Sequence, residues 1–285
     1  MTPTGLLAIS FPDLDPVAFS IGPVAVKWYG LAYMAGLLLG WLYIRNLLTT
    51  ARIWPAGEPP LAAARLDDLL LYVTLGVIVG GRLGFVLFWE PAHYLAHPLD
   101  IPKVWKGGMA FHGALLGCGV AAWLFARQNR VALLPVMDLA AAAVPIGLFF
   151  GRIANFINGE LWGRVTAAPW GMVFPEAKLY FPGSEPQPRH PSQLYEAALE
   201  GLALFLILRW LTHRAGALER PGLVTGAFLA GYGLFRAVVE IFWRQPPMLH
   251  PLTHGWLTPG AAYSLPMILG GLWLAARARR TAAVA

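Results

Sequence analysis

The sequence has few charged residues and almost no cysteine. Asp, Glu, Lys and Arg make up 13% of its 285 residues, whereas 57% are hydrophobic. A soluble domain carries about 25% charged residues, so this composition indicates a polytopic membrane protein. The single cysteine, Cys118, excludes an intramolecular disulfide and a thiolate metal cluster.

Several common site motifs are also absent. The chain contains no HExxH, GxSxG or Walker A pattern. His93–His97 and His250–His254 have metal-like spacing, but both pairs lie in proline-punctuated loops without nearby carboxylate or thiolate ligands. We therefore expect no metal site. The N-terminus has no charged segment followed by an apolar stretch and a cleavage site, so we expect no removable signal peptide.

Apolar runs of membrane-spanning length recur along the chain. A helix needs about 20 such residues to cross a bilayer. We expect seven spans, at Val26–Leu48, Leu69–Trp89, Met109–Phe125, Leu133–Ile157, Gln193–Leu211, Gly222–Trp243 and Ala261–Ala275. The pattern predicts an all-α polytopic membrane protein in which residues 1–285 form a single membrane domain.

Residues 158–191 are polar and rich in proline, and predict a small external head segment between spans four and five. Residues 1–22 are expected to form an interfacial or extramembrane arm.

The distribution of basic residues predicts the orientation. Of the 21 Lys and Arg residues, eleven lie at or after the ends of spans one, three, five and seven, and seven lie on the opposite side. Cytoplasmic loops carry an excess of Lys and Arg, so the N-terminus is expected outside and the C-terminus in the cytoplasm. This rule also accounts for the net charge of +6 without a nucleic-acid partner.

The three remaining arginines, Arg82, Arg152 and Arg236, lie inside or at the rim of spans. Arg152, Asn155 and Gly159 follow helical spacing, so we expect them to share one face if the helix continues. Polar residues at the same level, in the outer half of the bilayer, are Lys27, Tyr29, His112, Asn155, His190, Gln193, Tyr195, Glu196, Tyr232 and Glu240. The inner half of these spans is nearly all aliphatic. Because ionisable residues inside a membrane are costly, this asymmetry across six spans predicts a functional site.

The chemistry of this set favours an anionic ligand. Arginines in a membrane cavity suit a phosphate, which they can bind bidentately while remaining charged. Glu240 follows Arg236 by one helical turn and can pair with it; alternatively, the pair only fixes span six against its neighbours. His112 is the only histidine expected within a span. It is a candidate general base or, alternatively, a satisfied ring near a helix N-terminus.

Aromatic and small residues in the spans have structural readings as well. Tyr29, Tyr195 and Tyr232 could each belong to an interfacial aromatic belt. Gly113, Gly117 and Gly119 favour close helix packing over ligand binding.

The stretch GRIANFINGELWGR, Gly151–Arg164, resembles the signature of the prolipoprotein diacylglyceryl transferase family. Further segments agree in order: KWYGLAYMAG at Lys27–Gly36, GGRLGFVLFW at Gly80–Trp89, MAFHGALLG at Met109–Gly117, RHPSQLYEA at Arg189–Ala197 and GYGLFRAVVEIFWR at Gly231–Arg244. The resemblance covers nearly the whole chain. It implies a seven-span enzyme of the bacterial inner (cytoplasmic) membrane with a small external head.

The resemblance also implies an activity and its partners. The substrates would be phosphatidylglycerol, presented by the surrounding membrane lipids, and the lipobox cysteine in the signal peptide of a preprolipoprotein. The sn-1,2-diacylglyceryl group would move to the cysteine thiol, forming a thioether and releasing glycerol-1-phosphate, as the first step of lipoprotein maturation. No metal or organic cofactor is expected.

The family's important positions fall on Tyr29, His112, Gly113, Arg152, Asn155, Glu160, Gly163, Tyr232, Arg236 and Glu240. Arg82 joins the predicted site because of its position within a span. The predicted catalytic residues are Tyr29, His112, Arg152, Tyr232 and Arg236. The predicted phosphatidylglycerol-binding residues are Arg82, Arg152, Asn155, Glu160, Gly163, Arg236 and Glu240. Two segments depart from the family pattern: Arg244-Gln245-Pro246-Pro247 replaces Arg-Glu-Pro-Asp, and Gly260-Ala261 replaces Gly-Gln. Both are expected at the outer rim, where they affect loop contacts and not the core set.

We expect Arg152 and Arg236 to hold the phosphate, Asn155 to position the headgroup and Glu240 to orient Arg236. His112 or a tyrosine would remove the thiol proton. The alternative function is a transporter or flippase for an anionic lipid, which would also place arginines in a membrane cavity. Transporters commonly show internal repeats and polar groups reachable from both sides, and the sequence has neither feature.

Overall fold

The computed structural model describes residues 9–12, 14–22, 24–54, 57–175, 177, 187–243 and 259–284. The chain divides into two compact units. The first unit comprises Met1–Tyr43 and Ala141–Ala285, and the second comprises Ile44–Ala140. The expectation of a single membrane domain stays a prediction.

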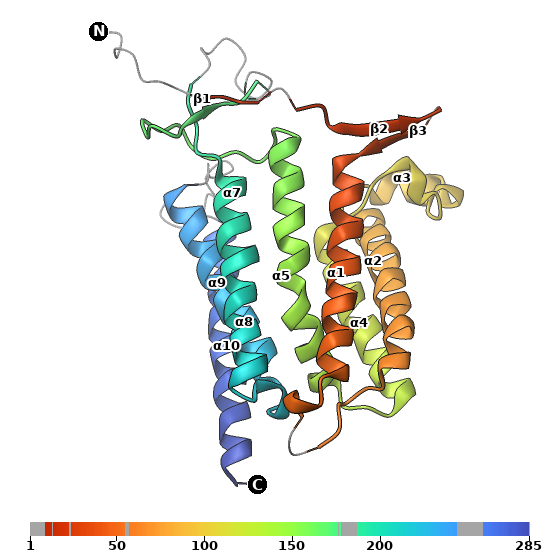
Figure 1. The fold of residues 1–285 in the computed structure, drawn as a ribbon. Coiled ribbons are helices and arrows are strands. Elements are labelled where there is room, and N and C mark those ends of the chain that lie inside the picture. The colour runs from red at the N-terminus through yellow and green to blue at the C-terminus, as the bar shows by residue number, and fades with distance from the viewer. Residues whose placement is uncertain are drawn as a thin grey trace. The chain divides into compact units, whose positions relative to one another are not determined.

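Helices dominate the first unit (Figure 1). They are α1 (Trp28–Thr49, up to Tyr43), α5 (Leu133–Ile157, from Ala141), α7 (Ser192–Glu196), the π-helix η5 (Ala197–Ala203), α8 (Leu204–Arg214), the short η6 (Ala217–Glu219), α9 (Leu223–Phe242) and α10 (Pro259–Val284). α7, η5 and α8 follow one another without a break, so they form one helical segment. α1 and α5 approach closely, because a Cβ at Gly36 would lie 3.0 Å from the Cα of Gly147.

Two long helices form the frame of the second unit. α2 (Leu66–Phe88) and α4 (Phe111–Asn129) accompany the shorter η1 (Ala51–Ile53), η2 (Ala63–Arg65), α3 (Pro91–Ala96), η3 (Pro98–Asp100) and η4 (Val104–Lys106).

Glycines allow α2 and α4 to pack closely. A Cβ at Gly76 would lie 2.5 Å from the carbonyl oxygen of Gly117, and a Cβ at Gly80 would collide with the carbonyl of Gly113. Small residues spaced by four let helix backbones approach in this way. The predicted packing role is confirmed for Gly113 and Gly117. It is wrong for Gly119, where an added Cβ would meet nothing within 4 Å.

The helices have membrane-spanning character. Among the described residues, four helical segments are long and apolar enough to cross a bilayer: Trp28–Thr49, Ala63–Phe88, Leu133–Ile157 and Leu223–Phe242. They coincide with expected spans one, two, four and six. A multi-pass helical membrane protein is thus supported, whereas the number seven and the orientation stay predictions.

Residues 9–12 and 14–22, the described part of the N-terminal arm, contain strands that the all-α prediction did not include. β1 (Ile9–Ser10) pairs in parallel with β4 (Met172–Val173), which joins the arm to the predicted head segment. β2 (Val17–Ile21) pairs antiparallel with β3 (Val24–Lys27). Because β3 continues to Lys27, the first helix begins at Trp28 and not at Val26 as expected.

Candidate functional site

The C-terminal end of α5 creates a sharp turn within the motif GRIANFINGELWG. Gly159 has a φ of 67°. Its N–H donates to the carbonyl of Phe156 at 2.9 Å, and the N–H of Glu160 donates to the carbonyl of Asn155 at 3.1 Å. These two bonds form a Schellman motif, which satisfies the last carbonyls of a helix. The turn therefore brings Glu160 back toward Asn155.

Asn155 connects three polar neighbours of the first unit. Its side-chain NH₂ donates to Oε1 of Glu160 at 2.8 Å and to the hydroxyl of Tyr29, near the start of α1, at 3.3 Å. Its Oδ1 accepts from Nη1 of Arg152 at 3.5 Å. The expectation that Arg152 and Asn155 share one face of the helix is confirmed.

Arg152 is paired with two glutamates from the next helical segment. Its Nε lies 2.6 Å from Oε2 of Glu196, and its Nη2 lies 3.4 Å from Oε2 of Glu200. Such charge-assisted contacts are the strong ones in proteins, so α5 and the α7–η5 segment are joined at this level.

Arg236, on α9, reaches the same two glutamates. Its Nη2 lies 3.1 Å from Oε2 of Glu240, which confirms the predicted pairing along α9. Its Nη1 lies 3.5 Å from Oε2 of Glu196 and 3.9 Å from Oε1 of Glu200. Tyr232 lies one turn before Arg236 on α9.

The glutamates and arginines of this cluster differ in exposure to solvent. The side chains of Glu196, Glu200 and Glu240 are at most 3% exposed, whereas those of Arg152 and Arg236 are each 17% exposed. A buried carboxylate is strongly destabilised unless it is paired. The arginines therefore stabilise the glutamates and are also the part of the cluster that a ligand can reach.

The backbone around the two shared glutamates is unusual. Residues Ala197–Ala203 form a π-helix that includes Glu200. A Cβ at Gly201 would lie 2.7 Å from Cβ of Phe149, so η5 and α5 pack closely beside the cluster. Short π-helical insertions are rare and frequently occur at functional sites.

Gly163, predicted to bind phosphatidylglycerol, occupies a closed position. Its N–H donates to the carbonyl of His190 at 2.8 Å. An added Cβ would collide with the carbonyl of Trp243 and lie 2.9 Å from Cβ of His190. The geometry indicates a packing role at the exit from α5 for Gly163. Its role in lipid binding stays a prediction.

Tyr195 of α7 contacts the segment that precedes this helix, through Trp170 and His190. The hydroxyl of Tyr195 accepts from Nε1 of Trp170 at 2.7 Å and lies 3.1 Å from Nδ1 of His190. Burial, and then the charge of Arg164, lower the pKa of His190. His190 therefore favours its neutral form.

Arg82, in the second unit, contacts backbone carbonyls. Nε donates to Ile101 at 2.7 Å, Nη2 to Asp100 at 2.7 Å, and Nη1 to Gly107 and Gly108 at 2.5 and 3.1 Å. Four of its five N–H groups are thus committed to the loop before α4. This geometry indicates a role in holding the loop, and the phosphate contact of Arg82 stays a prediction.

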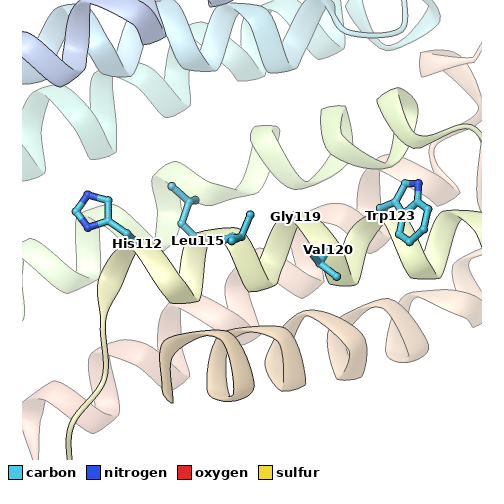
Figure 2. Close-up of a pocket in the computed structure, with 6 residues that line it drawn as sticks. His112, Leu115, Gly119, Val120 and Trp123 are labelled. Atoms are coloured by element: carbon cyan, nitrogen blue, oxygen red, sulfur yellow. The ribbon is translucent and has the colours of Figure 1, made fainter. Parts of the chain in front are cut away.

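His112, also in the second unit, lies at the beginning of α4. It is exposed and borders a cavity of about 470 Å³. Figure 2 draws the residues that line this cavity. The lining residues are His112, Leu115, Leu116, Gly119, Val120 and Trp123. Their spacing places them on one face of the helix. A predominantly apolar groove with a histidine at its end is compatible with a lipid-facing base, and that role stays a prediction.

Sequence reasoning missed Glu200 and gave Glu196 no role. Glu200 lies one turn beyond Glu196 inside an apolar stretch, and both are fully buried. Two glutamates spaced by four in a membrane segment were the available signal, because an intramembrane carboxylate is by default a functional candidate. Of the two departures from the family pattern, Arg244–Pro247 lies outside the described residues. Gly260 lies nearer the core set than expected, since an added Cβ would be 2.7 Å from Cδ of Glu240.

The chain is similar to known proteins along almost its whole length. The family model for prolipoprotein diacylglyceryl transferase matches residues 16–277. The phosphatidylglycerol–prolipoprotein diacylglyceryl transferase of Rhizobium meliloti (strain 1021) is 51% identical over 282 residues, covering 99% of this chain and 98% of that protein. The protein of the same name from Cereibacter sphaeroides (strain ATCC 17025 / ATH 2.4.3) is 55% identical over 291 residues, covering 96% and 99%.

Proposed function

The chain belongs to the prolipoprotein diacylglyceryl transferase family, and we propose that it transfers the sn-1,2-diacylglyceryl group of phosphatidylglycerol to the lipobox cysteine of preprolipoproteins. The observation that carries the residue-level proposal is the convergence of Arg152 and Arg236 on the same two buried glutamates. Two adjacent, partly exposed guanidinium groups fit a phosphodiester, which presents oxygens to both.

The reaction forms a carbon–sulfur bond and breaks a carbon–oxygen bond. The cysteine sulfur attacks the carbon of the diacylglyceryl group that is bonded to the phosphate oxygen. The electron pair of the broken carbon–oxygen bond stays on that oxygen, which leaves with glycerol-1-phosphate. Arg152 and Arg236 stabilise the charge that develops on that oxygen. Asn155 positions the headgroup, with its amide oriented by Tyr29 and Glu160. Glu240 orients Arg236.

A base must remove the thiol proton, since the thiolate is the nucleophile. We assign this role to His112, because imidazole is the side chain that most often serves as a general base. Tyr29 and Tyr232 are the alternatives.

We propose that seven helices span the bacterial cytoplasmic membrane, with the N-terminus outside and the C-terminus in the cytoplasm. Four helices of suitable length and composition, together with the distribution of arginines, support this topology. Such an orientation brings the arginine pair to the outer leaflet, at the level where the lipobox cysteine leaves the end of a signal helix.

Transfer is tested with the purified protein in phosphatidylglycerol vesicles and a synthetic lipobox peptide. Mass spectrometry should detect the diacylglyceryl adduct, together with released glycerol phosphate. A peptide with serine in place of cysteine and vesicles of phosphatidylcholine are the controls, and neither should give an adduct. A folded protein that forms no adduct would contradict the proposal, and its ability to move labelled lipid across vesicles would then test the transporter alternative.

The arginine roles are tested in the same assay. Arg152→Ala and Arg236→Lys should each lower kcat/KM by about 10²–10³-fold or more, as expected for loss of a group that stabilises transition-state charge. Arg65→Lys changes an exposed arginine of the second unit and should leave the rate unchanged. Near-normal activity of Arg152→Ala or Arg236→Lys in folded protein would exclude the phosphate contact.

The base is tested separately with His112→Gln. This variant should lose activity, because no imidazole remains to accept the thiol proton. Retained activity would transfer the role to Tyr29 or Tyr232, which Tyr→Phe variants then distinguish.

A further inference from the structure

The two glutamates of the α7–η5 segment, Glu196 and Glu200, have no assigned part in the reaction proposed above. Both are fully buried, and each contacts both arginines. We infer that this glutamate pair positions Arg152 and Arg236 for the substrate phosphate. The inference deepens the proposed function and rests on it.

Each of the two glutamates contacts both arginines. Glu196 Oε2 lies between Arg152 Nε and Arg236 Nη1, at 2.6 and 3.5 Å. Glu200 uses one carboxylate oxygen for each arginine, at 3.4 and 3.9 Å. The arginines come from two different helices, α5 and α9, and the glutamate pair comes from a third. The pair therefore sets the separation of the two arginine side chains.

Two arginines in one site need an anionic partner. Two guanidinium groups repel each other at close range, and the repulsion is stronger in a poorly solvated site than in water. Carboxylates placed between them make their proximity favourable. The glutamate pair thus allows two cations to occupy one site before a phosphate arrives.

Burial indicates which side of the cluster a ligand meets. The glutamate side chains are at most 1% exposed, whereas the arginine side chains are 17% exposed. A phosphate therefore approaches the arginines and not the carboxylates. Glu196 and Glu200 act through the arginines, which makes them positioning residues and not catalytic ones.

The local backbone supports a fixed geometry. Glu200 lies within the π-helix of residues Ala197–Ala203, and the neighbouring Gly201 packs against the backbone of Phe149, with 2.8 Å between an added Cβ and its Cα. Because Phe149 precedes Arg152 by less than one turn, this contact holds the glutamate pair beside Arg152. Displacing reacting groups by about 1 Å can cost about 10²-fold in rate.

The test compares Glu200→Gln and Glu196→Gln, which remove charge at nearly constant volume, with Glu219→Gln, at an exposed glutamate in η6 of the same unit. Transfer is measured per folded enzyme, with kcat and KM for phosphatidylglycerol determined separately. Glu200→Gln should lower kcat at least 10-fold and change KM less, because misaligned arginines lose mainly transition-state contacts. Glu219→Gln should match the unaltered protein.

Combining variants separates positioning from a purely structural role. If Glu200 acts through both arginines, the loss caused by Glu200→Gln should be smaller in an Arg236→Lys background than in the unaltered protein. Losses that multiply fully in the double variant would overturn the inference. So would unchanged kcat of Glu200→Gln. Should Glu200→Gln fail to fold, Glu200→Asp keeps the charge and withdraws it by one methylene, and full activity of that variant would also overturn the inference.

The same experiment keeps the two proposals apart. If the unaltered protein forms no adduct, the proposed function fails, and the inference fails with it. If the unaltered protein is active and the glutamate variants are equally active, only the positioning role fails.

Discussion

The three glycines of the motif GRIANFINGELWG should respond differently to the same substitution by alanine. Gly151 is helical, and an added Cβ would meet nothing within 4 Å. Gly159 has a φ of 67°, and Gly163 is enclosed by Trp243 and His190. Adding one methyl group therefore tests three properties separately: helix propensity at Gly151, left-handed backbone at Gly159 and steric enclosure at Gly163.

Each magnitude follows from the local geometry. Gly151→Ala should be neutral or stabilise the helix by up to about 1 kcal/mol, because alanine has the higher helix propensity. Gly159→Ala places a Cβ in the left-handed region, which costs about 1–2 kcal/mol. Gly163→Ala should cost about 1–3 kcal/mol or more, since the added carbon meets backbone atoms that cannot rotate away.

Thermal unfolding of the purified variants in detergent measures these differences. At roughly 2–4 °C per kcal/mol, Gly159→Ala should lower Tm by about 2–8 °C. Gly159→Asn is the matched control, since asparagine tolerates the left-handed region better than alanine, and it should lose less. Transfer activity should fall for Gly159→Ala beyond its loss of folded protein, because Glu160 no longer orients Asn155.

A specific result would refute this reasoning. If Gly159→Ala and Gly159→Asn had the same Tm as the unaltered protein, the left-handed turn would not be present in solution. If Gly151→Ala destabilised as much as Gly163→Ala, steric enclosure would not explain the requirement for glycine in this motif.

Three further outcomes are expected. Arg82→Lys loses most of the four carbonyl contacts and should lower stability by about 1–3 kcal/mol, with faster hydrogen exchange in residues 100–108. Burial lowers the pKa of His190 below its ordinary value of 6.5. As the pH falls through about 6.5, the unfolded chain protonates this imidazole before the folded chain does, so Tm should drop between about pH 7.5 and 5.5. The drop should be smaller for His190→Asn. Tyr29→Phe removes one acceptor of the Asn155 amide, about 1 kcal/mol, and should lower Tm by about 2–4 °C and reduce transfer about 5-fold.

Local patterns predicted the parts of the site that lie on one helix. The spacing of three residues placed Asn155 beside Arg152, and the spacing of four placed Glu240 beside Arg236; the structure confirms both contacts. Such pairs depend only on helix geometry, which the sequence specifies wherever an apolar segment is long enough. The helices at spans one, two, four and six were predictable for the same reason.

Contacts between distant segments were not predictable in this way. Arg82 and the carbonyls that it contacts are separated by 18–26 residues, and the conformation of that loop has no periodic pattern. An arginine inside a span was therefore interpreted as a ligand for phosphate. The strand pairing of Ile9 with Met172 was missed for a similar reason, since two-residue strands leave too little alternation to detect.

Glu200 differs from these cases, because charge balance could have identified it. The sequence placed Arg152 and Arg236 in the membrane with Glu240 as the only assigned counter-charge, and unbalanced charge is costly there. A neighbouring helical segment should therefore supply carboxylates at the same level, and Ser192–Arg214 contains only Glu196 and Glu200. The same rule also selects Asp138, which is equally buried but belongs to the second unit. Charge balance thus narrows the search to a few carboxylates, and only the three-dimensional contacts with both arginines distinguish the glutamate pair among them.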